Sequence, residues 1–315
     1  MNDDTAANAN ANANAEPQPA AQVARYWGDE RKDLVKHNWL EHPVTQAWFY
    51  RRRAGDPKAN LYDYWRDKFL STPAPLALSV GCGFGAFERV ALMWNLAQRF
   101  EACDLSENAI AQARIYAAEQ GLADRVTYSV ANLDAVSLPE ARYDAIFGIS
   151  SLHHVTELDH LFAQCRQALK PGGLLFVDEY VGPARFQSAP HVVALINRLI
   201  GILPERYRRS VYLNGAPRQA YENPPPEMFE HSDPSEAIRS DAIVPTLSRY
   251  FEIIDYKPYG GALLHMLLSG TAGNFDPASD SDIALLEMMA LLEEELEKAG
   301  VIGSDFVSLV AKPKP

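Results

Sequence analysis

Residues 77–88 read Ala-Leu-Ser-Val-Gly-Cys-Gly-Phe-Gly-Ala-Phe-Glu, and this stretch decides the fold. A short apolar run ends in glycines at alternating positions, Gly81, Gly83 and Gly85, and a helical pattern follows at once. Because glycine tolerates positive φ and close backbone approach, the stretch predicts a strand, a tight turn and a helix start. In an α/β sheet such a turn lies at the carboxyl edge of its strand, where nucleotide-like ligands bind. The glycines alone leave open which nucleotide binds.

Composition excludes several classes of protein. The chain has 315 residues, of which 47% are hydrophobic, enough for a substantial core. Its net charge of −12 argues against a nucleic-acid-binding surface. No run approaches about 18 consecutive apolar residues, and the N-terminus lacks a secretory signal, so we expect a cytoplasmic protein without a membrane span. Three scattered cysteines, Cys82, Cys103 and Cys165, suit neither a disulfide framework nor a zinc site, and we predict no metal.

The chain divides into three parts. Residues 1–20 carry an Ala-Asn repeat with few large apolar side chains, which predicts a disordered tail. Residues 21–72 are rich in aromatic side chains and are broken at Pro43 and Gly55, which predicts an extension of short helices. From residue 73 to residue 315 we expect a single α/β domain.

Strands alternate with helices from Leu76 onward, which predicts a parallel sheet covered by helices on both faces. Ser106 and Thr156 are the expected N-caps of two of these helices, and Gly121 is an expected stop. The expected strands are Leu76–Val80, Arg99–Cys103, Arg125–Val130, Tyr143–Gly148, Leu174–Asp178, Phe251–Tyr256 and Phe306–Ala311. The last two would complete a sheet of seven strands.

The stretch from about residue 182 to residue 236 interrupts the alternation. It contains an apolar helical pattern at Val192–Leu203 and a Pro-rich segment at 224–226. A connection of this length is unusual inside a compact domain unless it has a function. We predict a lid, inserted after the fifth strand, that covers the ligand edge of the sheet.

Four motifs carry a resemblance to a known family. They are Ser79-Val80-Gly81-Cys82-Gly83-Phe84-Gly85, Cys103-Asp104-Leu105-Ser106, Tyr143-Asp144-Ala145-Ile146-Phe147 with Ser151-Leu152-His153-His154-Val155, and Leu169-Lys170-Pro171-Gly172-Gly173. In this order they resemble the motifs of class I S-adenosylmethionine-dependent methyltransferases. The paired histidines are similar to those of the ubiquinone-biosynthesis-like branch (methyltransferase types 11 and 12). The resemblance covers residues 76–180 only.

The resemblance implies an α/β fold with a Rossmann-like seven-stranded sheet and an antiparallel last strand. It also implies S-adenosyl-L-methionine as cofactor. The expected activity is transfer of its methyl group to a small-molecule or lipid-like acceptor, most readily at an oxygen atom, less so at carbon or nitrogen.

The same resemblance places the cofactor-binding residues. The glycine turn with Cys82 would approach the methionine and ribose, and Asp104, followed by Leu105, would accept hydrogen bonds from the ribose hydroxyls. Asn132, followed by Leu133, would meet the adenine amino group, since an amide oxygen can accept that hydrogen bond. Asp134 is a competing assignment for the adenine contact. Ser150, after the fourth strand, completes the set.

Candidate catalytic residues follow the fourth and fifth strands. If the acceptor is a hydroxyl, a base must take its proton, and His153, His154 and Glu179 are the candidates. The alternative is that these histidines cap the next helix or stack near the cofactor. Tyr180, Tyr259 and His265 are expected to line the acceptor pocket, with ordinary loop packing as the alternative.

Other interpretations stay open at this stage. The glycine turn and Asp104 also satisfy a looser dinucleotide fingerprint, which would suit an NAD(P)-dependent oxidoreductase. A methyltransferase-like domain that binds cofactor without catalysis is a further alternative. The arginines at 51–53 and at 206–209 would hold an anionic acceptor or simply be solvated. The aromatic N-terminal helices would cover the acceptor, join the core or form a homodimer contact.

Overall fold

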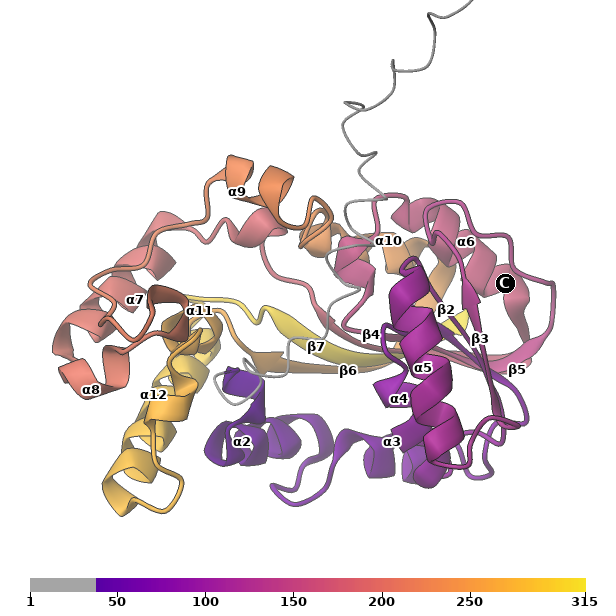
Figure 1. Cartoon of the computed structure of the whole chain (residues 1–315), viewed down its shortest axis with the longest axis horizontal. Helices are drawn as coiled ribbons and strands as arrows, with labels where there is room; N and C mark the ends of the chain where they lie inside the picture. The colour runs from indigo at the N-terminus through magenta and orange to yellow at the C-terminus, as the bar shows by residue number, and fades with distance from the viewer. Residues whose placement is uncertain (1–37) are drawn as a thin grey trace, which may run out of the picture.

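A seven-stranded sheet forms the centre of the computed structural model, which describes residues 38–315 (Figure 1). The predicted tail at 1–20 and the start of the helical extension lie outside the described residues. The strand order is β3-β2-β1-β4-β5-β7-β6. The strands are β1 Ala77–Val80, β2 Phe100–Asp104, β3 Val126–Val130, β4 Tyr143–Ile149, β5 Leu169–Tyr180, β6 Phe251–Gly260 and β7 Phe306–Pro313.

Strand directions confirm the predicted fold class. The pairs β1–β2, β1–β4, β2–β3 and β4–β5 are parallel, whereas β7 runs antiparallel to both β5 and β6. The last strand, β7, therefore lies between β5 and β6, and both of these neighbours run in the direction opposite to its own. Since β1 to β5 are parallel, their carboxyl ends meet at one edge, and that edge positions the candidate site.

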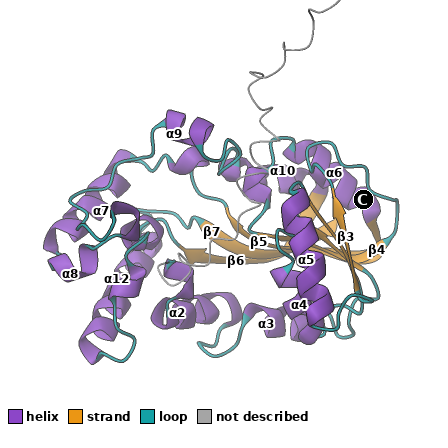
Figure 2. Cartoon of the chain, in the orientation of Figure 1, coloured by secondary structure: helices purple, strands orange, loops and turns teal. Residues whose placement is uncertain are grey.

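Helices cover both faces of the sheet and extend beyond its β6 end (Figure 2). Ahead of β1 lie a short 3-10 helix at Trp39–Glu41, α2 Pro43–Ala54 and α3 Leu61–Phe69. The others are α4 Ala86–Met93, α5 Glu107–Glu119, α6 Leu158–Ala168, α7 Pro190–Ile202, α8 Glu205–Arg208, α9 Pro226–His231, α10 Ile243–Tyr250, α11 Leu264–Leu268 and α12 Asp280–Lys298. The connection from β5 to β6 thus contains α7 to α10. None of the helices within residues 38–315 combines the length and apolar character needed to cross a bilayer.

The core follows the period-two alternation of the strands. Ile146 of β4 packs into a cluster with α6 and α10, whereas the adjacent Phe147 packs with α3, α4 and α5 on the opposite face. Val177 and Phe176 of β5 repeat this division. A third cluster joins α2, α7, α11 and α12 beyond the parallel strands. The interior is therefore two layers around the sheet plus a separate apolar centre under the β5–β6 connection.

Helix boundaries follow local hydrogen bonds, with one correction. Ser106 caps α5 as predicted, because its hydroxyl accepts from the Ala109 N–H at 3.2 Å. Thr156 is not the cap of α6. Instead, Asp134 Oδ1 accepts from the N–H groups of Thr156 and Glu157, both at 2.9 Å. A carboxylate from a distant loop replaces the local hydroxyl here, which the local pattern alone did not reveal.

Candidate active site

The glycine turn between β1 and α4 leaves open space at the carboxyl edge of the sheet. Gly81 has φ of 72°, and a Cβ there would overlap Cβ of Ser151, so a side chain would collide with the loop after β4. Gly83 has φ of 49°, but apart from its chain neighbours no heavy atom of residues 38–315 lies within 4 Å of its Cβ position. The turn therefore packs tightly against the protein at Gly81 and leaves room for a ligand at Gly83.

Asp104, at the end of β2, is tied to this turn. Its Oδ2 accepts from the Gly83 N–H at 2.8 Å, and its Oδ1 accepts from the Ser106 N–H at 2.9 Å. Each carboxylate oxygen has a second acceptor position. A half-buried carboxylate with acceptor capacity beside an open glycine turn fits the ribose diol that the sequence motif implies.

The loop after β3 separates the two adenine candidates. Asp134 is committed to the N–H groups of Thr156 and Glu157, and Asn132 Oδ1 accepts from the Asp134 N–H at 3.0 Å. The Asn132 side chain is exposed, and Leu133 Cδ1 lies 3.7 Å from the Cβ position of Gly81. This arrangement favours Asn132 and Leu133 as the adenine contacts.

Leu105 and Ser150 are the two remaining residues predicted to bind the cofactor. Leu105, directly after Asp104, is half-buried. Ser150 has φ of 48°, and its N–H donates to the Asp178 carbonyl at 2.8 Å. The positive φ turns the chain after β4 sharply toward the glycine turn.

Glu179 organises the loop after β4. Its carboxylate is buried; Oε1 accepts from the N–H groups of Ser151 and Leu152, and Oε2 accepts from the Tyr180 N–H at 2.9 Å. Oε2 also lies 2.7 Å from Nδ1 of His153. Both oxygens of Glu179 are therefore engaged with this loop, with Tyr180 and with His153.

The two histidines have opposite electrostatic environments. Burial alone would lower the pKa of His153, but the carboxylates of Glu179, Glu236 and Asp233 outweigh it and raise the pKa to about 9. Burial and the neighbouring His153 and Arg185 charges hold the pKa of His154 well below its usual range. Burial therefore acts against a charge on both rings, and the neighbouring carboxylates outweigh it only at His153.

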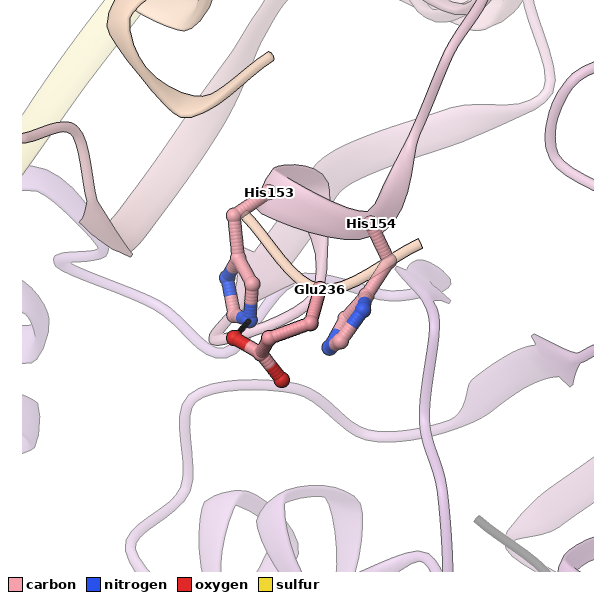
Figure 3. A group of neighbouring side chains, drawn as sticks. All are labelled: His153, His154 and Glu236. Atoms are coloured by element: carbon pink, nitrogen blue, oxygen red, sulfur yellow. Dashed lines mark ion pairs between the residues drawn. The ribbon is translucent and has the colours of Figure 1, made fainter. Parts of the chain in front are cut away.

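Glu236, from the β5–β6 connection, joins this loop and was missed by the sequence analysis (Figure 3). Its Oε1 lies 3.7 Å from Nε2 of His153, and burial raises the pKa of its carboxyl group. The segment around it is anchored because the Ile238 N–H donates to the His153 carbonyl at 3.1 Å. Arg185 also donates to the carbonyls of Pro234 and Glu236, at 2.6 and 2.7 Å. No sequence pattern marked this stretch as part of a site.

Tyr180 and His265 belong to an aromatic cluster beside the histidines. The Tyr180 ring centroid is 6.5 Å from that of His153 and 5.8 Å from that of His265. His265 contacts the rings of Trp39, Phe186 and Phe306 as well. Its Nδ1 has no hydrogen-bond partner within residues 38–315, and burial lowers its pKa to about 4. A neutral, unpaired imidazole in an aromatic wall is suited to an apolar ligand with a single polar group.

Tyr259 packs against the Phe306 ring of this cluster and is also engaged by Arg53. The Arg53 guanidinium lies 4.6 Å from the centre of the Tyr259 ring and pairs with Asp178 at 2.9 Å. Arg52 pairs with Glu297, and Arg206 with Asp282. These arginines are therefore used in pairs that join α2 and α8 to the rest of the fold.

Residues 78–177 match the model of a methyltransferase domain. This range runs from β1 to β5 and includes the glycine turn, Asp104 and the paired histidines. The chain therefore carries an S-adenosylmethionine-dependent methyltransferase domain. The match resolves the ambiguity of the glycine turn, because a dinucleotide-dependent oxidoreductase would not share the later motifs.

Curated relatives of the methyltransferase domain differ in what they methylate. The chain is 32% identical over 159 residues to the ubiquinone biosynthesis O-methyltransferase of Roseobacter denitrificans, covering 49% of this chain and 58% of that protein. It is 24% identical over 161 residues to a sterol 24-C-methyltransferase of Gibberella zeae, covering 51% of this chain and 42% of that one. The chain thus spans about half the length of these curated relatives.

Solved structures share the fold over nearly the whole chain. Geranyl diphosphate C-methyltransferase from Streptomyces coelicolor aligns with a TM-score of 0.52 at 16% identity, covering 96% of this chain and 100% of that one. The cyclase SpnF aligns with a TM-score of 0.50 at 18% identity, covering 95% and 98%. At such identities the likeness extends to the fold alone.

Proposed function

We propose that the whole chain is an enzyme that transfers the methyl group of S-adenosylmethionine to an oxygen atom of a small-molecule or lipid-like acceptor. The observation that carries this proposal is the position of His153 and Glu236. They adjoin the loop whose Ser151 packs directly against Gly81 of the donor turn. Groups that can handle a hydroxyl proton are thus next to the place where the methyl donor would bind.

The donor site needs only a few residues of this chain. Asp104 would hold the ribose, Asn132 and Leu133 the adenine, and the open face of Gly83 the adjoining part of the cofactor. S-adenosylmethionine, when bound, supplies an electrophilic methyl group on a sulfonium. Methyl transfer is an in-line displacement, so the protein contributes mainly alignment and exclusion of water.

On the acceptor side, His153 and Glu236 would bind the hydroxyl, and its proton would pass to the Glu236 carboxylate as the methyl group is transferred. The 3.7 Å between His153 Nε2 and Glu236 Oε1 leaves each group able to hydrogen-bond an inserted oxygen. Glu179 fixes the imidazole through Nδ1, so Nε2 keeps one direction. The aromatic cluster around Tyr180 and His265 would bind the apolar body of the acceptor.

Transfer to carbon is a second candidate, and the aromatic cluster favours it. Methylation of an alkene creates a carbocation, and the faces of Trp39, Tyr180 and Phe306 are the kind of surface that stabilises a cation. Relatives named as sterol 24-C-methyltransferases and geranyl diphosphate C-methyltransferase support the same idea. The two candidates differ in the atom that carries the new methyl group.

One experiment separates these possibilities. The purified protein is incubated with S-adenosylmethionine carrying a 13C-labelled methyl group and a panel of prenylated phenols and isoprenoid alkenes. An O-methyl carbon signal in the NMR spectrum of the product supports the proposal, whereas a C-methyl signal overturns it in favour of the second candidate. Calorimetric binding of S-adenosylmethionine without product from any acceptor or cell extract would instead favour a non-catalytic cofactor-binding protein.

We also propose partners and a compartment for this protein. The net charge of −12 favours no role for nucleic acid, and we propose a cytoplasmic protein. We also propose a homodimer. Size-exclusion chromatography with light scattering tests it, and a molar mass near that of the single 35.0 kDa chain would exclude it.

A further inference from the structure

Three potential metal ligands converge at the acceptor side of the site. One ring nitrogen of His153, one of His154 and a carboxylate oxygen of Glu236 all lie within 4.8 Å of one another (Figure 3). Two of these residues follow β4, and the third comes from the β5–β6 connection more than 80 positions later. Their meeting is therefore a property of the tertiary fold.

Both imidazoles are held from behind, as metal-binding histidines usually are. Nδ1 of His153 faces Glu179 Oε2 at 2.7 Å, and Nδ1 of His154 faces the Ser235 hydroxyl at 3.0 Å and Asp233 Oδ2 at 3.4 Å. A carboxylate or hydroxyl on Nδ1 fixes the tautomer and orientation of the ring, and it raises the basicity of Nε2. In this site, Nε2 of His153 faces Glu236 Oε1 at 3.7 Å.

The local charge also favours a cation. Glu179, Asp233 and Glu236 place three carboxylates around His153, and the charge of Arg185 acts on His154. The side chains are shielded: His153 is 11% exposed, His154 18% and Glu236 23%. Partial shielding with a remaining opening suits an ion that keeps a position for an outside ligand.

We propose that His153, His154 and Glu236 bind a divalent transition-metal ion, with Zn²⁺ as the type case. Two imidazoles and one carboxylate form the ligand set of catalytic zinc and of other open divalent sites, which leave further positions free. Ligands of a tetrahedral Zn²⁺ ion lie about 3.3 Å apart, given bonds of about 2.0 to 2.1 Å. The 3.7 Å between His153 Nε2 and Glu236 Oε1 is close to this value. A small closure of Glu236 and His154 completes the site.

This proposal departs from the prediction of no metal, which considered the cysteines only. The metal site itself stands on the three side chains, whereas its role in the reaction rests on the proposed function. In that role, the open coordination position would take the acceptor oxygen, and the ion would lower the pKa of its hydroxyl.

The test measures metal binding directly on the full chain. Metal-free protein is incubated with Zn²⁺, passed over a desalting column and analysed for bound zinc, and Co²⁺ absorption reports the ligand types. We expect about one equivalent of Zn²⁺ and a Co²⁺ spectrum of nitrogen and oxygen ligands without a thiolate band. Absence of stoichiometric binding in the wild-type protein overturns the site.

Variants locate the ion. His153→Gln and Glu236→Gln should each weaken binding by about 10-fold or more, and Glu179→Gln by about 10-fold through the loss of its hold on Nδ1. Glu227→Gln, in the exposed first turn of α9, and His191→Gln, at an exposed position of α7, are the matched controls and should bind as the wild type does. Unchanged zinc affinity in both His153→Gln and Glu236→Gln, with wild-type circular dichroism, would overturn the assignment.

Methyl transfer is measured on the same samples so that the two proposals fail separately. Zinc binding without methyl transfer leaves the metal site standing and contradicts the proposed function. Methyl transfer that proceeds in protein shown to bind no zinc or cobalt supports the function and overturns the metal site.

Discussion

Nδ1 of His153 lies 2.7 Å from Oε2 of Glu179, which joins the loop after β4 to the carboxyl end of β5. The same carboxylate accepts hydrogen bonds from the N–H groups of Ser151 and Leu152. One buried side chain therefore sets both the path of the loop and the direction of the imidazole. Because Ser151 packs against Gly81, the pair also fixes the distance between the acceptor side and the donor turn.

Replacing His153 separates chemistry from donor binding. In His153→Gln, we expect kcat to fall about 100-fold, the usual scale for loss of a group that assists proton transfer. The Kd of S-adenosylmethionine should stay unchanged, because the donor contacts are assigned to other residues. Steady-state kinetics and calorimetry measure the two quantities, with His191→Gln as control. Full retained rate in His153→Gln would remove this residue from the reaction.

Replacing Asp104 should have the opposite signature. Two hydrogen bonds from ribose hydroxyls to a carboxylate contribute about 3 kcal/mol, so Asp104→Ala should weaken S-adenosylmethionine binding by about 100-fold or more. Calorimetry measures the affinity, and circular dichroism checks that the fold remains. Asp124→Ala, at an exposed position after α5, is the control. Wild-type affinity in Asp104→Ala would exclude the ribose assignment.

Gly83 tests the open face of the donor turn against a matched glycine. Gly83 and Gly121 both have positive φ, 49° and 69°, and in the described part of the chain only their sequence neighbours come within 4 Å of the two Cβ positions. Substitution by alanine should therefore lower the free energy of unfolding by a similar amount at each position, about 1 kcal/mol. Only Gly83→Ala should weaken cofactor binding, by about 10-fold or more. Equal affinity in the two variants, at equal melting temperature, would mean that no ligand approaches Gly83.

Asp305 predicts a pH dependence of stability. Burial, with a smaller contribution from Glu297, raises the pKa of Asp305 from 3.8 to about 7. Between these values the folded chain binds more protons than the unfolded chain. The contribution of Asp305 to the free energy of unfolding therefore falls as pH rises from about 4 to about 7. Asp305→Asn removes the titration and should raise the melting temperature relative to wild type at pH 8, with little difference at pH 4. A constant difference in melting temperature across this range would contradict the assignment.

The parallel part of the sheet was predictable because its signals are local. Strand, turn and helix follow one another within residues 77–93, and the glycines, Ser106 and Gly121 act on their immediate neighbours. The prediction of the cofactor-binding residues uses the same principle, because parallel strands bring their carboxyl ends to one edge of the sheet whatever the arrangement of the helices. The predicted start of β5 was late: the strand begins at Leu169 and includes Gly172 and Gly173. Glycine marked a turn in the sequence, whereas pairing with β4 decided the strand.

The sequence by itself determined the domain class and the donor, because a glycine turn and a strand-end carboxylate act through backbone geometry within short stretches of chain. Only the tertiary structure decided the acceptor side. Glu236 and Asp233 meet the histidines because Arg185 and the Ile238 N–H hold their segment against the loop after β4. Arg53 of α2 likewise contacts Asp178 of β5 and Tyr259 of β6 across the fold. These contacts join residues far apart in the chain, and no local periodicity records them.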